Sequence, residues 1–381
     1  MKSVFDLDLT GKHVLARVDF NVPLVNQTVT DDFRIKACLP TIRHLLKEGA
    51  SVALISHLGR PSEGEFKEKY SLRPVAKVLS DLLKTKVGFE KNWIDGLDWE
   101  KERLTLCENV RFLSGENSND FDLAKKMATL CDVYVNDAFA SAHRAHASTL
   151  GVAALSKQSC AGPLLVAEIK ALDRIIKKTK KPVLAIVGGS KVSTKIDLLE
   201  NLAIKADHLI VGGGIANSLL KAKGIHVGNS LVEEESKETA KRLNNDYNNI
   251  ILPDDVVCAK NFNENAKGVI KSVDAIEEDD QILDFGPSSL QSMSKLIMNA
   301  ETIIWNGPVG VFEFKNFEAG TKIIGESIAS SKAYSVAGGG DTVAAINKFG
   351  LSSEISYVST AGGAFLEYLE GRELPALTPL S

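Results

Sequence analysis

The sequence predicts an α/β fold of two Rossmann-like lobes, each a mostly parallel sheet covered by helices, joined by a hinge helix. First, apolar strand-like runs alternate with helical segments along most of the chain, which is typical of parallel sheets. Second, several of these runs are continuously apolar, as expected of strands buried on both faces. Third, a chain of 381 residues is too long for one average core, so two domains are expected.

Composition indicates a globular enzyme of a reducing compartment. The chain is 44% hydrophobic and 25% charged, and its net charge of -4 argues against a nucleic-acid partner. No apolar leader or membrane-length run appears, so no membrane partner is expected. The five cysteines follow no CxxC or Cys/His spacing, which argues against zinc sites and disulfides. We expect a cytoplasmic enzyme.

The first half alternates strands near 13–20, 51–56, 104–107 and 132–137 with helices near 34–48, 72–84 and 119–130. Pro40 lies inside the first helix and weighs against its continuity. Basic and polar residues follow each strand, in order Arg17, Asp19, Asn21, then His57, Arg60, then Arg111, then His143, Arg144, His146.

Ligands of such sheets bind where the parallel strands end. One arginine after one strand is usually a surface residue or a loop brace. Arginine or histidine after four successive strands, with Arg34 opening the first helix, instead predicts a basic bowl for a small ligand carrying phosphate and carboxylate. Eight of the eleven arginines precede residue 151, whereas every Gly-Gly cluster follows it, so the halves are expected to hold different ligands.

A connecting helix is predicted over 162–182, between Gly162-Pro163 and a basic run that precedes Pro182. The apolar run Val183–Val187 then turns on Gly188-Gly189 into a helix that Ser190 can cap. That helix would place Lys191 and Lys195 on one face. The alternative is an ordinary strand–helix turn with two solvated lysines, and the stretch is not a Walker A loop.

Three more glycine turns follow strands, within 208–220, 334–346 and 357–371, and Asn306-Gly307-Pro308 leads to Glu313. The turn in 334–346 continues into Asp341 and Thr342. Its amides can cradle phosphate, and Asp341 can hold Mg²⁺ or act as a plain N-cap. The charged segments 231–249 and 260–281 are predicted to be solvated helix and loop.

Eight motifs resemble the phosphoglycerate kinase family in order and spacing, from about residue 5 to 375: RVDFNVP, SHLGRP, ENVRF, AHRAH, GGSKVSTK, WNGPVGVFE, GGGDT and ST-x-GGA. The resemblance implies reversible Mg²⁺-dependent phosphoryl transfer in glycolysis and gluconeogenesis, from 1,3-bisphosphoglycerate to ADP, giving 3-phosphoglycerate and ATP. It also implies lobe closure, in-line transfer and a monomer.

The resemblance implies the following site residues. The acid substrate would be held by Asp19, Asn21, Arg34, His57, Arg60, Arg111 and Arg144, with His143 and His146 beside them. The nucleotide would meet Lys195, Gly212, Gly213, Gly214, Glu313, Gly339, Gly340, Asp341 and Thr342, with Asp341 at the metal. Catalytic roles would fall to Arg34, Lys191, Gly340 and Gly363.

The implied domains are an acid-substrate domain (1–165, with the tail 370–381 packing back on it), an interdomain helix (166–181) and a nucleotide domain (182–369). The chain departs from the family at Ala361 and Ala140, where glycine is usual, and in a short tail.

Two other interpretations of the function remain open: a non-catalytic two-lobed anion-binding protein, and a different kinase or ligase on a doubly wound scaffold. A phosphate-cradling turn at Gly339–Thr342 with lysines opposite favours a kinase over a receptor.

Overall fold

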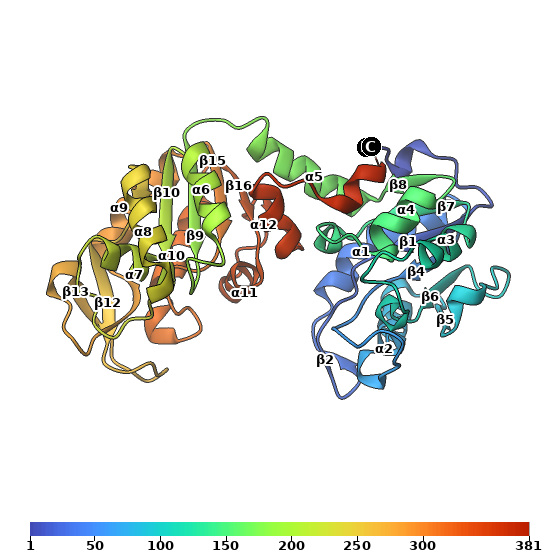
Figure 1. Ribbon diagram of the computed structural model, residues 1–381, viewed down its shortest axis with the longest axis horizontal. Helices are drawn as coiled ribbons and strands as arrows, with labels where there is room; N and C mark the ends of the chain where they lie inside the picture. Colours follow the sequence, from blue (N-terminus) through green and yellow to red (C-terminus); the bar gives the residue numbers. More distant parts are fainter. Residues whose placement is uncertain (381) are drawn as a thin grey trace. The chain divides into compact units, whose positions relative to one another are not determined.

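The computed structural model describes residues 1–380 (Figure 1). The chain divides into two compact units. The N-terminal unit contains residues 1–170 and the segment that begins at Glu373, and the C-terminal unit contains residues 171–372. Helix α5 (Pro163–Ile176) runs across the division. The predicted tail segment 370–381 ends in Ser381, which lies outside the described residues.

The N-terminal unit is built on a six-stranded parallel sheet with the order β5-β6-β4-β1-β7-β8. Its strands are β1 (His13–Arg17), β4 (Ser51–Ile55), β5 (Gly88–Glu90), β6 (Leu104–Cys107), β7 (Val133–Asn136) and β8 (Ser159–Ala161). Arg17, at the end of β1, pairs in register with Ile55 of β4 and Asn136 of β7. Four strands were predicted; the three-residue strands β5 and β8 are too short to show a periodicity.

The helices of this unit are α1 (Phe33–Lys47), α2 (Arg73–Leu83), α3 (Phe121–Thr129) and α4 (Val152–Leu155), and a hairpin joins β2 (Leu24–Val25) to β3 (Thr28–Val29). Helix α1 continues through Pro40. Its Ile35, Ile42 and Leu45 are fully buried in the core beneath the sheet, and this packing outweighs the lost hydrogen bond. The C-terminal segment joins this unit, where Ala376 N donates to Ala142 O at 3.1 Å.

The C-terminal unit has a second six-stranded parallel sheet, with the order β11-β10-β9-β15-β16-β17. Its strands are β9 (Val183–Gly188), β10 (His208–Gly212), β11 (Ile250–Ile251), β15 (Thr302–Asn306), β16 (Tyr334–Ala337) and β17 (Tyr357–Val358). All six residues of β9 are buried, as its apolar run predicts. Gly212 pairs with Gly188, and Asn306 pairs with Val187, so the turns that follow these strands gather at one edge.

The helices of this unit are α6 (Ile196–Lys205), α7 (Gly213–Ala222), α8 (Lys237–Asp246), α9 (Pro287–Asn299), α10 (Ala319–Ser330), α11 (Gly340–Phe349) and α12 (Gly363–Leu369). The prediction that a helix follows Gly189 directly is wrong, because α6 begins only at Ile196. Residues 190–195 form turns instead, and Ser193 N donates to the Glu233 carboxylate at 2.8 Å. Ser190 therefore caps no helix, and Lys191 and Lys195 do not share a helix face.

A small antiparallel sheet, β13-β12-β14, lies beside the larger one in this unit. Its strands are β12 (Asp255–Ala259), β13 (Val269–Ser272) and β14 (Gln281–Phe285). The prediction of solvated helix and loop over 260–281 therefore missed β13. That edge strand exposes Val269 and Ile270, so its apolar residues do not alternate with polar ones as in a half-buried strand. The segment 231–249 contains α8, as predicted.

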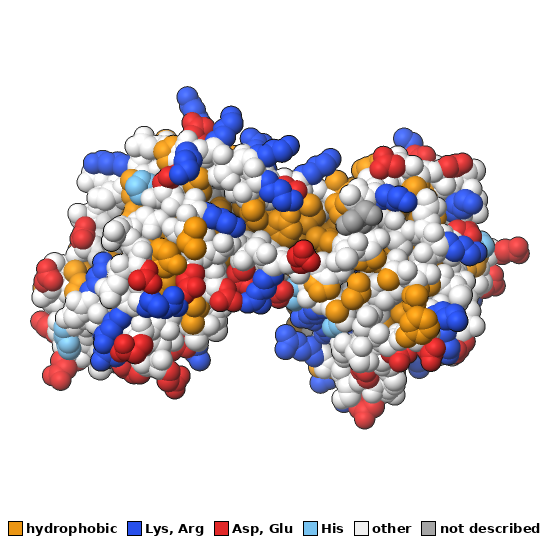
Figure 2. All heavy atoms as spheres, turned by 45° about the horizontal axis from the view of Figure 1, so that its top comes forward, with side chains coloured by type: hydrophobic (Ala, Val, Ile, Leu, Met, Phe, Trp, Pro, Cys, Tyr) orange, Lys and Arg blue, Asp and Glu red, His pale blue; other side chains and the backbone are white. Residues whose placement is uncertain are grey.

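Charged side chains of both signs are mixed over the face shown in Figure 2, in keeping with a net charge of -4. Within residues 1–380, no helix has both the length and the apolar character needed to cross a bilayer.

Candidate functional site

In the N-terminal unit, the residues predicted at strand ends come together in a group that we call the basic cluster. It consists of Arg17, Arg34, His57, Arg60, Arg111, Arg144 and His146. Burial holds the pKa of His57 well below 6.5, and the charges of Arg17, Arg111, Arg144 and Arg34 lower it further. The imidazole is therefore neutral near pH 7.

Hydrogen bonds fix several members of the cluster. Arg17 is 1% exposed; its Nε donates to Ser148 Oγ at 3.2 Å, and its Nη2 lies 3.1 Å from His57 Nδ1. Arg34 forms an ion pair of 2.7 Å with Asp19, and its side chain remains 31% exposed. The partly exposed Arg34 can therefore reach a ligand, whereas the buried Arg17 holds Ser148 and His57 in place.

Asn21 and Asp19 shape the loop that follows β1. Asn21 N donates to Asp19 Oδ1 at 3.0 Å, and Asn21 Oδ1 accepts from Gly59 N at 2.9 Å. The backbone after β1 is thereby tied to the backbone after β4. Asn21 itself stays only half-buried, which keeps its amide near the cluster.

Arg111 is held at an electrostatic cost in the ligand-free chain. It is 6% exposed, its Nη1 donates to Gly59 O, and its Nε is buried without a hydrogen-bond partner among residues 1–380. Burial and the charges of Arg144, Arg17 and Arg60 lower its pKa to about 10. An anion placed here would relieve both the repulsion and the missing hydrogen bond.

Few counter-charges balance the cluster. Asp19 pairs with Arg34, and Glu116 is fully buried, accepting from Ser148 N at 2.9 Å and Ser148 Oγ at 2.6 Å. Burial raises the pKa of Glu116. Sequence reasoning placed Arg17 at a strand end without a role and missed Glu116, which lies in an acidic loop without a distinguishing pattern.

The two remaining predicted histidines also lie here. His146 Nδ1 is 3.7 Å from Glu116, and burial together with Arg111, Arg17 and Arg144 lowers the pKa of His146 to about 4. Arg144 Nε donates to His143 Nε2 at 3.2 Å. His146 therefore adds no positive charge at neutral pH, so the arginines supply the positive charge around it.

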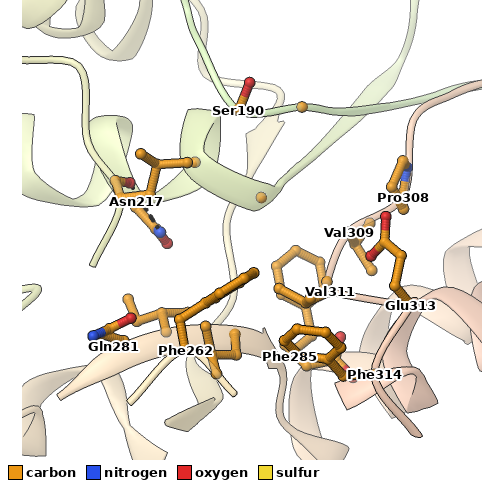
Figure 3. A pocket seen from close by; sticks show the side chains of 18 of the residues that line it. Ser190, Asn217, Phe262, Gln281, Phe285, Pro308, Val309, Val311, Glu313 and Phe314 are labelled. Atoms are coloured by element: carbon orange, nitrogen blue, oxygen red, sulfur yellow. Dashed lines mark hydrogen bonds between the residues drawn. The ribbon is translucent and has the colours of Figure 1, made fainter. Parts of the chain in front are cut away.

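In the C-terminal unit, the strand-end turns border a pocket of about 430 Å³. Its walls are mainly apolar, and its lining includes Gly189, Ser190, Gly213, Gly214, Asn217, Leu231, Phe262, Leu283, Phe285, Pro308, Val309, Val311, Phe314, Glu313 and Asp341. Figure 3 shows Phe262 and Glu313 approaching the space from opposite sides. An apolar slot with a few carboxylates and open backbone suits a flat base joined to polar groups.

Glycine is required where the turns touch. Gly213 has φ +64°, and a Cβ there would lie 2.6 Å from Gly189 O; a Cβ on Gly212 would lie 2.6 Å from Val309 Cα. Gly213 lines the pocket, and Gly212 directly precedes it in the chain. The turn glycines therefore let three strand ends approach one another, apart from any contact with a ligand.

Lys195 and Lys191 occupy different environments. Lys195 Nζ donates to Gly188 O at 2.6 Å and Asn306 Oδ1 at 2.7 Å, and burial lowers its pKa to about 8, against the attraction of Asp341. Lys191 is exposed on the turn before α6. Lys195 is thus held by strand ends near Asp341, whereas Lys191 faces solvent.

The turn before α11 places Asp341 and Thr342 in the first helical turn. Gly339 is the N-cap residue, with φ +100°, so the plain N-cap reading of Asp341 is wrong. Asp341 is exposed, lines the pocket, and makes no side-chain hydrogen bond or ion pair with the described residues. Thr342 Oγ1 accepts from Gly307 N at 2.7 Å and donates to Gly338 O at 2.9 Å, so this hydroxyl holds the turns together.

Gly363 begins α12 outside the pocket. It borders a polar groove of about 350 Å³ with Ser193, Thr194 and Asp197. Ala361 stands where the family usually has glycine. Its φ is not positive, so its methyl group causes no backbone strain.

Sequence reasoning missed the walls of the pocket. Leu283 and Phe285 come from β14 of the small sheet, and Phe262 comes from the loop that joins β12 to β13; not all of these strands were predicted. Asp284, beside them, is 1% exposed; its Oδ2 accepts from Gly320 N at 2.7 Å, and burial raises its pKa to about 7. The apolar residues before Gly286-Pro287 were the available signal, but nothing in their pattern indicated a ligand.

Comparison with known proteins covers almost the whole chain. The family model described as phosphoglycerate kinase matches residues 4–372. The chain belongs to the phosphoglycerate kinase family. It is 54% identical to the phosphoglycerate kinase of Francisella tularensis subsp. novicida over 98% of this chain and 96% of that protein. It is 53% identical to that of Vibrio campbellii over 98% of this chain and 97% of the relative.

Solved structures agree. The phosphoglycerate kinase structure from Coxiella burnetii superposes with a TM-score of 0.93 at 50% identity, covering 99% of this chain and 98% of that one. That from Pyrococcus horikoshii gives 0.86 at 31% identity, with coverage of 100% and 98%. The resemblance, the α/β fold of two mostly parallel sheets and the assignment as a phosphotransferase of the phosphoglycerate kinase family are confirmed. A non-catalytic anion-binding protein is not favoured.

Proposed function

We propose that the basic cluster binds 3-phosphoglycerate or 1,3-bisphosphoglycerate and that the apolar pocket binds ADP or ATP. The observation that carries this division is the chemical contrast between the units. One unit gathers five arginines around few carboxylates, and the other offers an apolar slot rimmed by strand-end turns. In this scheme residues 1–165 with 370–381 form the acid-substrate domain, 182–369 the nucleotide domain, and 166–181 the interdomain helix.

In the acid-substrate domain, Arg60, Arg111 and Arg144 would hold the phosphate, supported by the orphaned Nε of Arg111. Asp19 would accept a hydrogen bond from the substrate hydroxyl, and Asn21 and the neutral His57 would donate to the remaining oxygens, with His143 and His146 beside them. Guanidinium groups suit this task because each can bind two phosphate oxygens at once.

In the nucleotide domain, Gly212, Gly213 and Gly214 would flank the adenine, and Glu313 would accept from the ribose hydroxyls. Amides of Gly339, Gly340 and Thr342 at the start of α11 would contact phosphate. Lys195 would reach a phosphate by exchanging its long contact of 3.5 Å with Asn306 O for a phosphate oxygen.

The exposed, unpaired carboxylate of Asp341 fits a Mg²⁺ that accompanies the nucleotide, because Mg²⁺ prefers oxygen ligands and binds through one or two carboxylates. When bound, the ion would neutralise charge on the phosphate oxygens. The charge of Asp341 also acts on Lys195, where it partly offsets the burial that lowers the pKa of that ammonium group.

The reaction needs no general base, since the carboxylate of 3-phosphoglycerate is ionised at neutral pH. Arg34 and Lys191 would stabilise the phosphoryl group in flight, aided by amides of Gly340 and Gly363. Because the ligands bind to separate domains, transfer in line requires closure that brings reacting atoms to about 3–3.5 Å. We further propose a cytoplasmic monomer without a nucleic-acid partner.

A coupled assay that follows ADP formation from 3-phosphoglycerate and ATP tests this function. Turnover should require both substrates, stop when EDTA removes Mg²⁺, and resume when Mg²⁺ is restored in excess. Lys237→Met, on the exposed start of α8, serves as a charge-matched control for Lys191→Met. Full turnover without Mg²⁺, or equal rates for these two variants, would refute the proposed site.

A further inference from the structure

The C-terminal unit contains another cavity, of about 230 Å³, that the function above does not use. It lies among the end of α5, the start of β9, the end of α6 and the end of α12. Val183, the first residue of β9, lines it, whereas Gly188 at the other end of β9 begins the turns of the nucleotide pocket. Six residues of a strand span about 16 Å, so the two cavities lie at opposite edges of the sheet.

The walls of this cavity are apolar. Its lining includes Ile175, Ile176, Leu202, Ile304 and Leu369. Ile175, Leu202 and Leu369 are at most 3% exposed, so these walls are almost closed to solvent. An apolar cavity of about 150 Å³ stays dry and binds benzene. A somewhat larger cavity of this kind can take an apolar tail of about six to eight carbons.

The mouth of the cavity is basic. Lys181 and Lys205 line it; Lys181 pairs with Asp207 at 2.9 Å, and Lys205 has no ion pair with any described residue. The segments 173–181 and 205–207 together carry six lysines and arginines against two aspartates, an excess of four positive charges. Lys181, at the end of this basic run, and Lys205 thus place two ammonium groups at an otherwise apolar cavity.

We propose that this cavity binds a small amphiphilic anion, a carboxylate with one apolar tail. The tail would lie against Ile175, Leu202 and Ile304, and the carboxylate would meet Lys205 and Lys181 at the mouth. An uncharged apolar molecule would not neutralise the excess positive charge at the mouth. A polyanion such as a nucleotide would have to bury charged groups against the apolar walls.

Calorimetric titration of the full chain with sodium butanoate, hexanoate and octanoate tests the proposal. Affinity should rise about fourfold for each added methylene until the cavity is full. Octan-1-ol should bind more weakly than octanoate. Saturating MgATP should leave octanoate binding unchanged, because the nucleotide pocket lies at the other edge. Competition by MgATP would mean that octanoate occupies that pocket and would overturn the proposal.

Variants locate the site. Ala206→Phe places a ring into the cavity from the end of α6 and should abolish octanoate binding. Lys205→Met should weaken binding by about two- to fivefold, the range of an exposed ion pair, whereas Lys237→Met should not change it. Unchanged affinity in a folded Ala206→Phe protein would overturn the proposal. If that variant does not fold, equal affinity for butanoate and octanoate, or equal binding by Lys205→Met and Lys237→Met, would do so.

Discussion

Replacing Arg111 with methionine should separate ligand binding from stability. Burial and the charges of the neighbouring arginines lower the pKa of Arg111 from 12.5 to about 10. This shift measures the free-energy cost of keeping the side chain charged. At about 1.4 kcal/mol per pKa unit this is about 3 kcal/mol, and solvent screening halves it to about 1.5 kcal/mol. The lost hydrogen bond to Gly59 O costs about 1 kcal/mol. The free energy of unfolding of Arg111→Met should therefore stay within about 1 kcal/mol of wild type.

Binding should respond differently. A charge-assisted hydrogen bond contributes about 1.5–3 kcal/mol, so the affinity of Arg111→Met for 3-phosphoglycerate should fall about 10- to 150-fold. Calorimetry measures this affinity, and hydrogen exchange in peptides from β1 and β4 reports the stability of the N-terminal unit. Both readings should be made on the same preparation.

Arg103→Met is the matched control. Arg103 Nη2 donates to Leu46 O at 2.9 Å and Ala50 O at 3.2 Å in the same unit, outside the cluster. Its loss should reduce stability by about 1–2 kcal/mol and leave 3-phosphoglycerate binding unchanged. If Arg111→Met instead destabilised the unit by more than 2 kcal/mol while binding 3-phosphoglycerate normally, Arg111 would be a structural brace and our reasoning would be wrong.

Three further outcomes are expected. Arg34→Ala and Lys191→Ala should each lower kcat by about 10³-fold with a smaller change in KM in the coupled assay, and normal turnover in both would remove them from the mechanism. Glu313→Gln should raise the Kd for ATP about tenfold without changing that for 3-phosphoglycerate; equal changes would contradict a ribose contact. Asp284→Asn should flatten the pH dependence of stability. In the folded protein the pKa of Asp284 is raised from 3.8 to about 7. The stabilising contribution of its protonated carboxyl group is therefore fully present below pH 4, and the free energy of unfolding falls by up to about 4 kcal/mol as pH rises to 7. Thermal unfolding of both proteins from pH 4.5 to 8 measures this, and an equal decline in both would exclude Asp284 as the cause.

The parallel sheets were predictable because their strands are continuous apolar runs. Val183–Val187 reads as a buried strand without reference to anything else in the chain. Strands such as β5 and β13 were not predictable. They are short and only partly buried, and they form because neighbouring strands supply partners.

The polar residues of the site could be predicted only as positions at strand ends. The register of β1, β4 and β7 brings Arg17, His57 and Arg144 together. In the sequence, only the order of the motifs along the chain indicated that these residues belong to one site. The helix expected after Gly189 fails because Ser193 and Glu233 stabilise turns there, a contact 40 residues apart in the sequence. The apolar walls with Phe262 were missed for the same reason, since they depend on tertiary pairing of the small sheet.

Paired titrations test the division of ligands most directly. Calorimetry of Arg111→Met and Asp341→Asn with 3-phosphoglycerate and with MgATP gives four affinities to compare with wild type. We predict that Arg111→Met loses 3-phosphoglycerate binding and keeps MgATP binding, and that Asp341→Asn does the reverse. A loss of both ligands in either variant, or of the opposite ligand, would contradict separate binding sites in the two units.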